Sequence, residues 1–180
     1  MSEDLKLNRP KVILIAAMGR NREIGSNNDL MWHLRADMQF FRETTMGHFV
    51  IMGRKNFDSI PPKYKPLQGR VNVIISRNPD FLYEECYTCS SIEESIEIAA
   101  SNGEEKVFVI GGGQIYQLAM DAGLVDEMYI THVDGSFSQA EVFYPDFAEG
   151  DWEKIHLQSV KADIQNEFDF EIFHYTRKHN

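Results

Sequence analysis

The chain has 180 residues, of which 43% are hydrophobic and 26% are charged. This composition is ordinary for a globular protein, and the length is enough for one domain whose core needs neither disulfides nor a structural metal. A formal net charge of −10 excludes a general nucleic-acid surface, which has to be basic, and no apolar run approaches the roughly 18 residues that span a bilayer.

The N-terminal segment 1–10 reads M-S-E-D-L-K-L-N-R-P, with two acids and no apolar run. It predicts a short polar extension and not a secretory signal. The two cysteines, Cys86 and Cys89, lack the second pair of ligands that a zinc site would need. We therefore expect reduced thiols, no metal and a cytoplasmic location.

The first element after the extension is the continuous apolar run from Lys11 to Met18, which is typical of a strand buried on both faces. A loop rich in Gly, Asn and Arg follows, from Gly19 to Asp29. It is long for a simple connection, which indicates a functional role. The next pattern predicts an amphipathic helix that carries Asp37 and ends by Gly47.

Asp37 has an unusual position on this helix. At about 100° per residue it falls within the apolar arc that contains Leu34, Met38 and Phe41, away from the charged side. An ionised carboxylate is costly to bury there unless a partner hydrogen-bonds to it. The alternative is a partly solvated acid in the first turn, where the helix dipole favours a negative charge. The helical pattern alone leaves both interpretations open.

The rest of the chain alternates between predicted strands and helices. Strands are expected at 49–52, 71–76, around Tyr87, at 106–110, 127–133, 152–161 and 168–177, and helices after 53, at 91–101 and at 114–120. Ser91 and Glu94 form a capping box for the helix at 91–101. The last two strands are longer and alternating, which favours an antiparallel pair at the sheet edge. The pattern as a whole predicts an α/β fold with a mainly parallel sheet.

Three motifs follow predicted strands, and ligands of open α/β sheets bind beyond the carboxyl ends of strands. They are M-G-R-K-N at Met52–Asn56, S-R-N-P at Ser76–Pro79 and V-I-G-G-G-Q-I-Y at Val109–Tyr116. Arg54, Lys55 and Arg77 would form a local basic patch suited to a phosphorylated cofactor. Alone, the first motif could be a solvated basic turn and the third a packing turn. The glycines do not match the G-x-G-x-x-G dinucleotide fingerprint.

In order along the chain, the motifs resemble the dihydrofolate reductase family, and its bacterial form most closely. The similarity covers nearly the whole chain after Pro10. Each piece alone is weak, whereas their common order is specific. The matching pieces are L-I-A-A (14–17), I-G (24–25), W-x-L-x-A-D (32–37), V-I-M-G-R (50–54), P-L-x-G-R (66–70), I-G-G-G-x-x-Y (110–116), T-H (131–132) and F-Y-P-D (143–146).

The resemblance implies a single-domain α/β fold over residues 11–180. Its mixed, mainly parallel eight-stranded sheet would have helices on both faces and a C-terminal antiparallel hairpin, and about 48–105 would form an adenosine-binding subdomain. The family reaction reduces 7,8-dihydrofolate with NADPH by hydride transfer to pterin C6, and it supplies one-carbon and thymidylate metabolism. Antifolate inhibitors would bind in the same cleft. We expect a monomer that binds neither nucleic acid nor membrane.

The resemblance also implies roles for individual residues. Asp37 would accept hydrogen bonds from the pterin and promote water-mediated protonation of N5, supported by Thr131. Trp32 and Leu30 would complete the catalytic set, and Arg70 would pair with the glutamate tail. The expected substrate-binding residues are Ile15, Ala17, Leu30, Asp37, Met38, Phe41, Ile60, Leu67, Arg70, Ile110, Tyr116 and Thr131. The expected cofactor-binding residues are Ala17, Ile24, Gly25, Gly53, Arg54, Lys55, Asn56, Ser76, Arg77, Ile110, Gly112, Gly113, Gln114, Ile115 and Tyr116.

Two further features are implied by the family: a cis peptide between Gly112 and Gly113, and a mobile lid formed by loop 19–28. The chain departs from the family pattern at Met31, Asn56 and Gln114, where proline, threonine and arginine are common, and its segment 61–65 is longer. Two alternatives remain: a related reductase of riboflavin synthesis, and a non-enzymatic nucleotide-binding module. Neither accounts for Asp37 together with Arg70.

Overall fold

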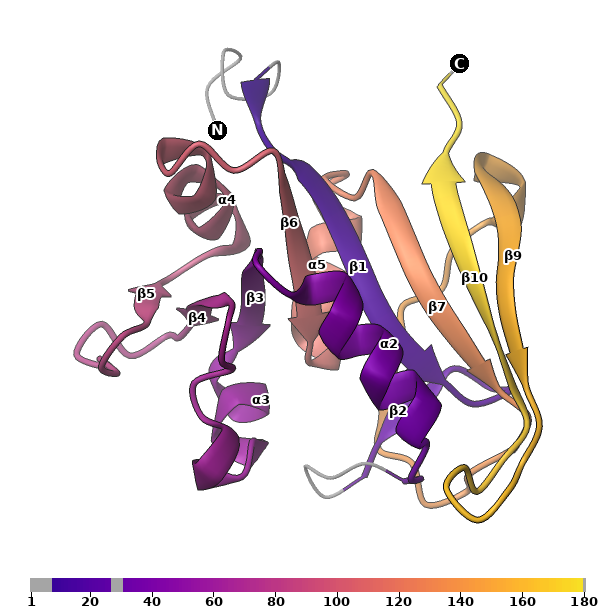
Figure 1. Ribbon diagram of the computed structural model, residues 1–180. Helices are drawn as coiled ribbons and strands as arrows, with labels where there is room; N and C mark the ends of the chain where they lie inside the picture. The colour runs from indigo at the N-terminus through magenta and orange to yellow at the C-terminus, as the bar shows by residue number, and fades with distance from the viewer. Residues whose placement is uncertain (1–7, 27–30, 180) are drawn as a thin grey trace.

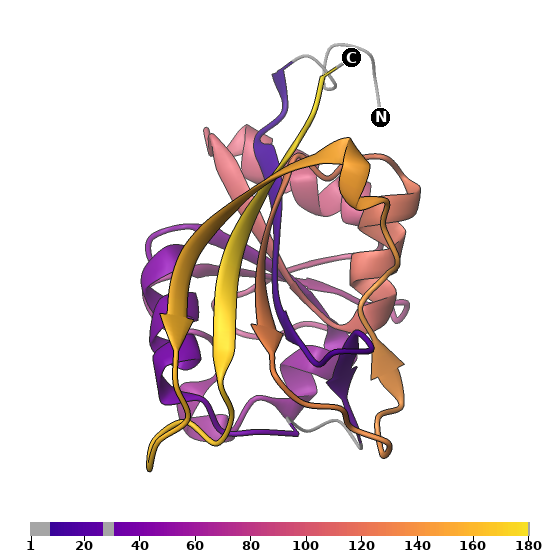
Figure 2. The same cartoon turned by 90° about the vertical axis from the view of Figure 1, so that its right-hand side faces the viewer.

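An eight-stranded sheet forms the centre of the protein, as described by a computed structural model over residues 8–26 and 31–179 (Figures 1 and 2). Its strands are β1 (Lys11–Met18), β3 (Phe49–Gly53), β4 (Val71–Ile75), β5 (Tyr87–Cys89), β6 (Lys106–Gly111), β7 (Glu127–Val133), β9 (Trp152–Val160) and β10 (Phe170–Arg177). They lie side by side in the order β5-β4-β3-β6-β1-β7-β10-β9.

The sheet is mainly parallel. All neighbouring pairs from β5 to β7 are parallel, whereas β10 runs antiparallel to both β7 and β9. This arrangement confirms the prediction of an antiparallel hairpin at one edge. A second, two-stranded sheet pairs β2 (Glu23–Gly25) with β8 (Val142–Phe143), and the sequence did not predict it. The loop after β1 is therefore tied to a segment more than a hundred residues later.

Helices cover both faces of the large sheet, as expected. On one face lie α2 (Arg35–Thr45) and α3 (Arg54–Ser59), and on the other lie α4 (Ile92–Ser101) and α5 (Gly113–Asp121) (Figure 1). The short 3-10 turns η1 (Pro62–Tyr64) and η2 (Glu149–Asp151) complete the elements.

Alternation along the strands explains the two cores. Val12 and Leu14 pack towards α5, and Ile13 and Ile15 pack towards α2, so β1 has buried residues on both faces. Each side chain buried in this way contributes about 2 kcal/mol. The continuous apolar run from Lys11 therefore forms a central strand.

The capping prediction for α4 is confirmed with one difference. Ser91 Oγ accepts a hydrogen bond from the Glu94 amide at 3.1 Å. The Glu94 carboxylate accepts from the Ser90 amide at 2.8 Å, one residue earlier than in a standard capping box. The interpretation of Ile92, Ile96 and Ala99 as the inward side also holds, because all three are buried.

The three strand-end motifs meet at one edge of the sheet. In the register of the parallel strands, Gly53 on β3 lies beside Ile75 on β4, and Met52 lies beside Gly111 on β6. The segments that follow these strands therefore emerge together. The sheet topology thus brings the basic and glycine-rich motifs close to one another.

Cys86 and Cys89 are both free thiols. Within residues 8–26 and 31–179, no helix is long and apolar enough to cross a membrane. In the same ranges, no three His, Cys, Asp or Glu side chains gather closely enough to hold a metal ion.

Candidate active site

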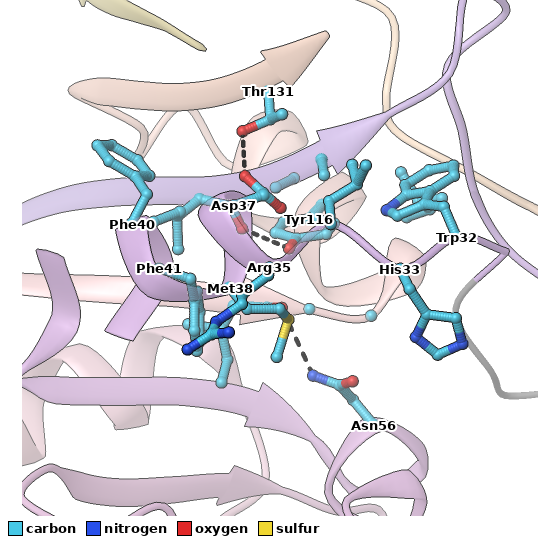
Figure 3. A pocket seen from close by; sticks show the side chains of 18 of the residues that line it. Trp32, His33, Arg35, Asp37, Met38, Phe40, Phe41, Asn56, Tyr116 and Thr131 are labelled. Carbon is cyan, nitrogen blue, oxygen red and sulfur yellow. Dashed lines mark hydrogen bonds between the residues drawn. The ribbon is translucent and has the colours of Figure 1, made fainter. Parts of the chain in front are cut away.

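A cavity of about 470 Å³ opens between α2 and the carboxyl ends of β1, β6 and β7 (Figure 3). Its wall is formed by residues of β1, β2, α2, α3, β6, α5 and β7 and of connecting segments. The lining residues are Ile15, Ala16, Ala17, Ile24, Trp32, His33, Leu34, Arg35, Asp37, Met38, Phe40, Phe41, Asn56, Ile110, Gly111, Gly112, Tyr116, Thr131 and Gln165.

Small residues at two strand ends leave the space for this cavity. Near its carboxyl end β1 has Ala16 and Ala17, and β6 ends in Ile110 and Gly111. Gly111 has a φ of +130°, a conformation that L side chains rarely adopt. A Cβ added at Gly112 would meet no atom within 4 Å, so the backbone there is open to a ligand.

The non-proline cis peptide lies between Gly111 and Gly112, and not between Gly112 and Gly113 as expected. The reason is the position of the two flanking elements. Since β6 continues through Gly111 and α5 begins at Gly113, the turn between them falls one bond earlier.

Asp37 points from α2 into the cavity, where its carboxylate meets Thr131 of β7 (Figure 3). Thr131 Oγ1 donates a hydrogen bond to Asp37 Oδ1 at 2.5 Å, which confirms the expected contact. Burial raises the pKa of Asp37 from its ordinary value of 3.8 to about 6, while the Thr131 hydrogen bond acts in the opposite direction. Asp37 is an acid in the first turn of α2 with intermediate exposure, as one interpretation expected. It also lies on the cavity side of the helix with a hydrogen-bond partner, as the other interpretation required.

Tyr116 of α5 lies close to this carboxylate and keeps its proton. Its hydroxyl donates to the Ile15 carbonyl at 2.6 Å. Burial, and secondarily the negative charge of Asp37, raise the pKa of Tyr116 far above its ordinary value. Asp37 is thus the group on this wall that can accept strong hydrogen bonds from a ligand's N–H groups.

The raised pKa of Asp37 predicts that Asp37→Asn stabilises the fold at high pH. The carboxyl binds its proton more tightly in the folded chain than in the unfolded chain, and this tighter binding stabilises the fold. The stabilisation is fully present below about pH 4 and is lost as the pH rises through about 6. The shift corresponds to ~3 kcal/mol. We expect Asp37→Asn to raise the free energy of unfolding by about that amount at pH 8 and hardly at all at pH 4, as measured by urea denaturation. Equal free energies of unfolding for Asp37→Asn and the unmodified protein at pH 8 would show that burying the ionised carboxylate does not destabilise the fold.

Arg70 lies beyond the inner wall, next to Phe41. Its guanidinium is 6.0 Å from the Phe41 ring centre, and Phe41 lines the cavity. Arg70 Nη1 donates to Thr45 Oγ1 at 3.3 Å, and Nε donates to the Gln68 carbonyl at 3.0 Å. Burial, and secondarily the charge of Arg42, lower the pKa of Arg70. An anion placed here would relieve both unfavourable effects.

The turn that holds Arg70 depends on Asn72, which the sequence reasoning missed. Asn72 is buried, and its amide donates to the carbonyls of Leu67 and Arg70 at 2.9 and 3.2 Å. Its Oδ1 accepts from the Leu67 amide at 3.0 Å. Asparagine within an apolar strand is a weak signal in the sequence, because only the folded turn shows what it binds.

The edge formed by β3, β4 and β6 has the chemistry of a phosphate site. The Arg54 guanidinium lies 4.2 Å from the Phe81 ring centre and 3.5 Å from Asp58, and its side chain is 42% exposed. Arg77 is also exposed at the end of β4. Gly53 allows α5 to approach, since a Cβ there would lie 2.9 Å from Ile115 Cγ1. Exposed guanidinium groups beside open backbone fit a phosphorylated nucleotide.

The cavity brings together many of the predicted residues but not all of them. Those that line it are Ile15, Ala17, Ile24, Trp32, Asp37, Met38, Phe41, Asn56, Ile110, Gly112, Tyr116 and Thr131. Those outside its lining are Gly25, Gly53, Arg54, Lys55, Ile60, Leu67, Arg70, Ser76, Arg77, Gly113, Gln114 and Ile115. Leu30, and Asn27–Asn28 of the expected lid, lie outside the described residues.

Several lining residues were not predicted. They are Ala16, His33, Leu34, Arg35, Phe40, Gly111 and Gln165. Most are sequence neighbours of predicted residues, so their positions could have been inferred. Gln165 is different, because it comes from the connection between β9 and β10 and no local motif marks it.

Comparison with known proteins places this geometry in a family. A family model described as dihydrofolate reductase matches residues 11–177. Curated dihydrofolate reductases of Bacillus subtilis (strain 168) and Staphylococcus haemolyticus are 35% and 34% identical to the chain, cover 94% and 93% of it, and are each covered over 96% of their own length. The chain is also similar to the solved structure of dihydrofolate reductase from Enterococcus faecalis complexed with NADP(H) and RAB-propyl. That match has a TM-score of 0.82 and 28% identity, and it covers 94% of this chain and 97% of the other.

Proposed function

Because this chain belongs to the dihydrofolate reductase family and is an NADPH-dependent enzyme that reduces dihydrofolate, we propose that Asp37 is the group that binds and activates the pterin. The observation that carries this proposal is the position of its carboxylate, bonded to Thr131 inside an otherwise largely apolar cavity. A pterin ring offers a 2-amino group and a ring N–H side by side. A carboxylate accepts such a pair of hydrogen bonds with good geometry.

Asp37 acts on the reaction through orientation and charge. The ionised carboxylate favours a protonated pterin, and with its pKa near 6 it responds to pH close to neutrality. The proton for N5 arrives through a water molecule, since Asp37 contacts the other side of the ring. The expected product is 5,6,7,8-tetrahydrofolate.

Trp32 closes the cavity wall next to this position. Its side chain is buried, and its ring centre is 5.0 Å from that of Phe137. This packing fixes the indole at the cavity, where it restricts solvent and helps to hold the water that protonates N5.

The edge of β3, β4 and β6 holds the cofactor. NADPH, when bound, supplies the hydride that reduces pterin C6. Ile110 separates the nicotinamide and pterin subsites, and Gly112 provides open backbone for the cofactor. The cofactor phosphates bind to Arg54, Lys55 and Arg77, and the 2′-phosphate is selected by Arg54 and Arg77. These residues belong to the proposed adenosine-binding subdomain, about 48–105.

Replacing Arg54 with alanine should narrow the preference for NADPH over NADH. Loss of one charge-assisted contact should lower kcat/KM with NADPH by about tenfold and leave the value with NADH nearly unchanged. Steady-state kinetics with both cofactors measures this ratio. Lys161→Ala, which removes an exposed cation just after the edge strand β9, is the matched control and should leave the ratio unchanged. A constant ratio in Arg54→Ala would transfer the role to Lys55 or Arg77.

A spectrophotometric assay of NADPH oxidation with dihydrofolate tests the overall function. Absence of turnover at micromolar enzyme would overturn it. Substituting a ribosylated pyrimidine for dihydrofolate separates this activity from that of the related reductase of riboflavin synthesis, which requires no glutamate-binding arginine.

We propose that the enzyme acts as a monomer in the cytoplasm, and size-exclusion chromatography with light scattering tests the oligomeric state. Antifolate inhibitors that present an amino group beside a protonated ring nitrogen would bind the same Asp37 carboxylate.

A further inference from the structure

The helix that carries Asp37 has no cap of its own. Its N-cap residue is Leu34, with extended backbone angles (φ −130°, ψ 92°) and no side-chain hydrogen bond to the helix. The side chain of leucine has no acceptor atom, and Leu34 is buried with an exposed fraction of 2%. The first backbone N–H groups of a helix need acceptors from elsewhere when the local cap is absent.

The hairpin between β9 and β10 supplies these acceptors. Asn166 Oδ1 accepts from the Ala36 amide at 3.0 Å, across 130 positions of the sequence. The Gln165 carbonyl accepts from the Arg35 amide at 3.1 Å. The Glu167 amide donates to the His33 carbonyl at 3.0 Å, so the contact joins both segments along their backbones. The tip of the hairpin therefore caps α2, because it accepts hydrogen bonds from the first backbone N–H groups of the helix.

The amide of Asn166 is held in the orientation that capping requires. Its side chain is buried, with an exposed fraction of 5%. Asp163 Oδ1 accepts from Asn166 Nδ2 at 3.0 Å and from the Asn166 and Gln165 amides at 2.8 Å each. Because Nδ2 is bound to Asp163, Oδ1 is directed towards Ala36. Exposed Asp163 thus fixes the rotamer of the buried capping residue.

We propose that Asn166 is a positioning residue for catalysis, which caps α2 from the distant hairpin and so holds the Asp37 carboxylate in place within the cavity. The inference rests on the proposed role of Asp37. Asp37 directly follows the capped residue Ala36, and Gln165, next to Asn166, lines the same cavity. A loss of the cap would loosen the turn of helix on which the carboxylate sits.

A neutral amide has a particular advantage at this position. An aspartate could also cap the helix, and the dipole would favour it. A second carboxylate, however, would add a negative charge near the Asp37 carboxylate and oppose its ionisation. Asparagine provides the acceptor without that charge.

The test compares Asn166→Ala with the unmodified full chain. Two readouts report on Asp37 itself: its titration, followed by ¹³C NMR of the labelled carboxyl carbon in the free protein, and kcat for dihydrofolate reduction. Loosening of the turn admits water, so the titration midpoint should fall from about 6 towards the ordinary range of an aspartate. We expect kcat to fall by about tenfold, since small misplacements of catalytic groups cost up to ~10² in rate. The Kd for NADPH should not change.

Two variants at the same tip separate positioning from general stability. Ile164→Ala alters a fully exposed side chain (relative exposure 102%) beside the cap and should leave both readouts unchanged. Asp163→Asn keeps an Oδ1 acceptor for its three donors, so it should change both readouts less than Asn166→Ala does. Every variant keeps the residues that surround Asp37 or line its cavity, which include Thr131, Tyr116, His33 and Arg35.

An unchanged Asp37 titration and an unchanged kcat in Asn166→Ala would overturn the inference, even with a lowered melting temperature. If that variant does not fold, Asp163→Ala takes its place, because Asp163 is exposed. A midpoint in Asp163→Ala equal to that of the unmodified chain would then overturn it. Failure of the proposed function would show differently: the unmodified enzyme would not reduce dihydrofolate, while the NMR titration would still report on the cap.

Discussion

Replacing Asp37 with asparagine should lower the rate of hydride transfer at pH 7 by about a thousandfold. Asparagine retains an oxygen that can accept from Thr131, so the local contact at 2.5 Å survives in a modified form. It turns an N–H donor towards the N–H groups of the pterin and removes the negative charge that favours protonation. NADPH should bind with unchanged affinity, because its proposed phosphate contacts lie at the ends of β3 and β4.

Single-turnover kinetics with preformed enzyme–NADPH complex measures this step directly. Glu43→Gln is the matched control, since Glu43 is an exposed acid on the same helix whose carboxylate contacts Gln39. It should react at the rate of the unmodified enzyme. Near-normal hydride transfer in Asp37→Asn would show that the carboxylate is not the key group.

Replacing Arg70 with alanine should raise KM for dihydrofolate by about a hundredfold, with a much smaller effect on kcat. Arg70 is partly buried, and the nearby charge of Arg42 makes the site favourable for an anion. Arg70→Lys should recover only part of the affinity, because an ammonium group cannot make the bidentate contact that a guanidinium makes with a carboxylate.

A dihydropterin without the glutamate tail provides the control for Arg70. If Arg70 binds the tail carboxylate, Arg70→Ala should have little effect on kcat/KM for this shortened substrate. An equal loss with both substrates would instead assign Arg70 to the fold of the turn that Asn72 organises.

Much of the fold was predictable because burial is recorded locally in the sequence. The apolar run from Lys11 reports how β1 is buried. The alternation at 152–161 does not report burial in the same way, because β9 is exposed along nearly its whole length. The capping pattern of Ser91 and Glu94 predicts where the helix at 91–101 begins. The gathering of the basic and glycine-rich motifs also followed from local information, since the carboxyl ends of parallel strands share an edge.

Other features of the site depend on contacts between segments far apart in the chain. The pairing of β2 with β8, and the capping of α2 by Asn166, join positions more than a hundred residues apart. Neither partner has a local pattern that identifies the other. The cis peptide was misplaced by one bond for a related reason: three successive glycines look alike until the ends of β6 and α5 are known.

Asp37 shows where the two kinds of information separate. The sequence alone determined that a carboxylate stands on the apolar side of an amphipathic helix, because that depends only on helical periodicity. The tertiary structure decided its chemistry: the cavity that raises its pKa to about 6, the Thr131 hydroxyl that binds it, and the distant hairpin that caps its helix. A pKa depends on the solvent and charges within a few ångströms, and those neighbours exist only once the chain has folded.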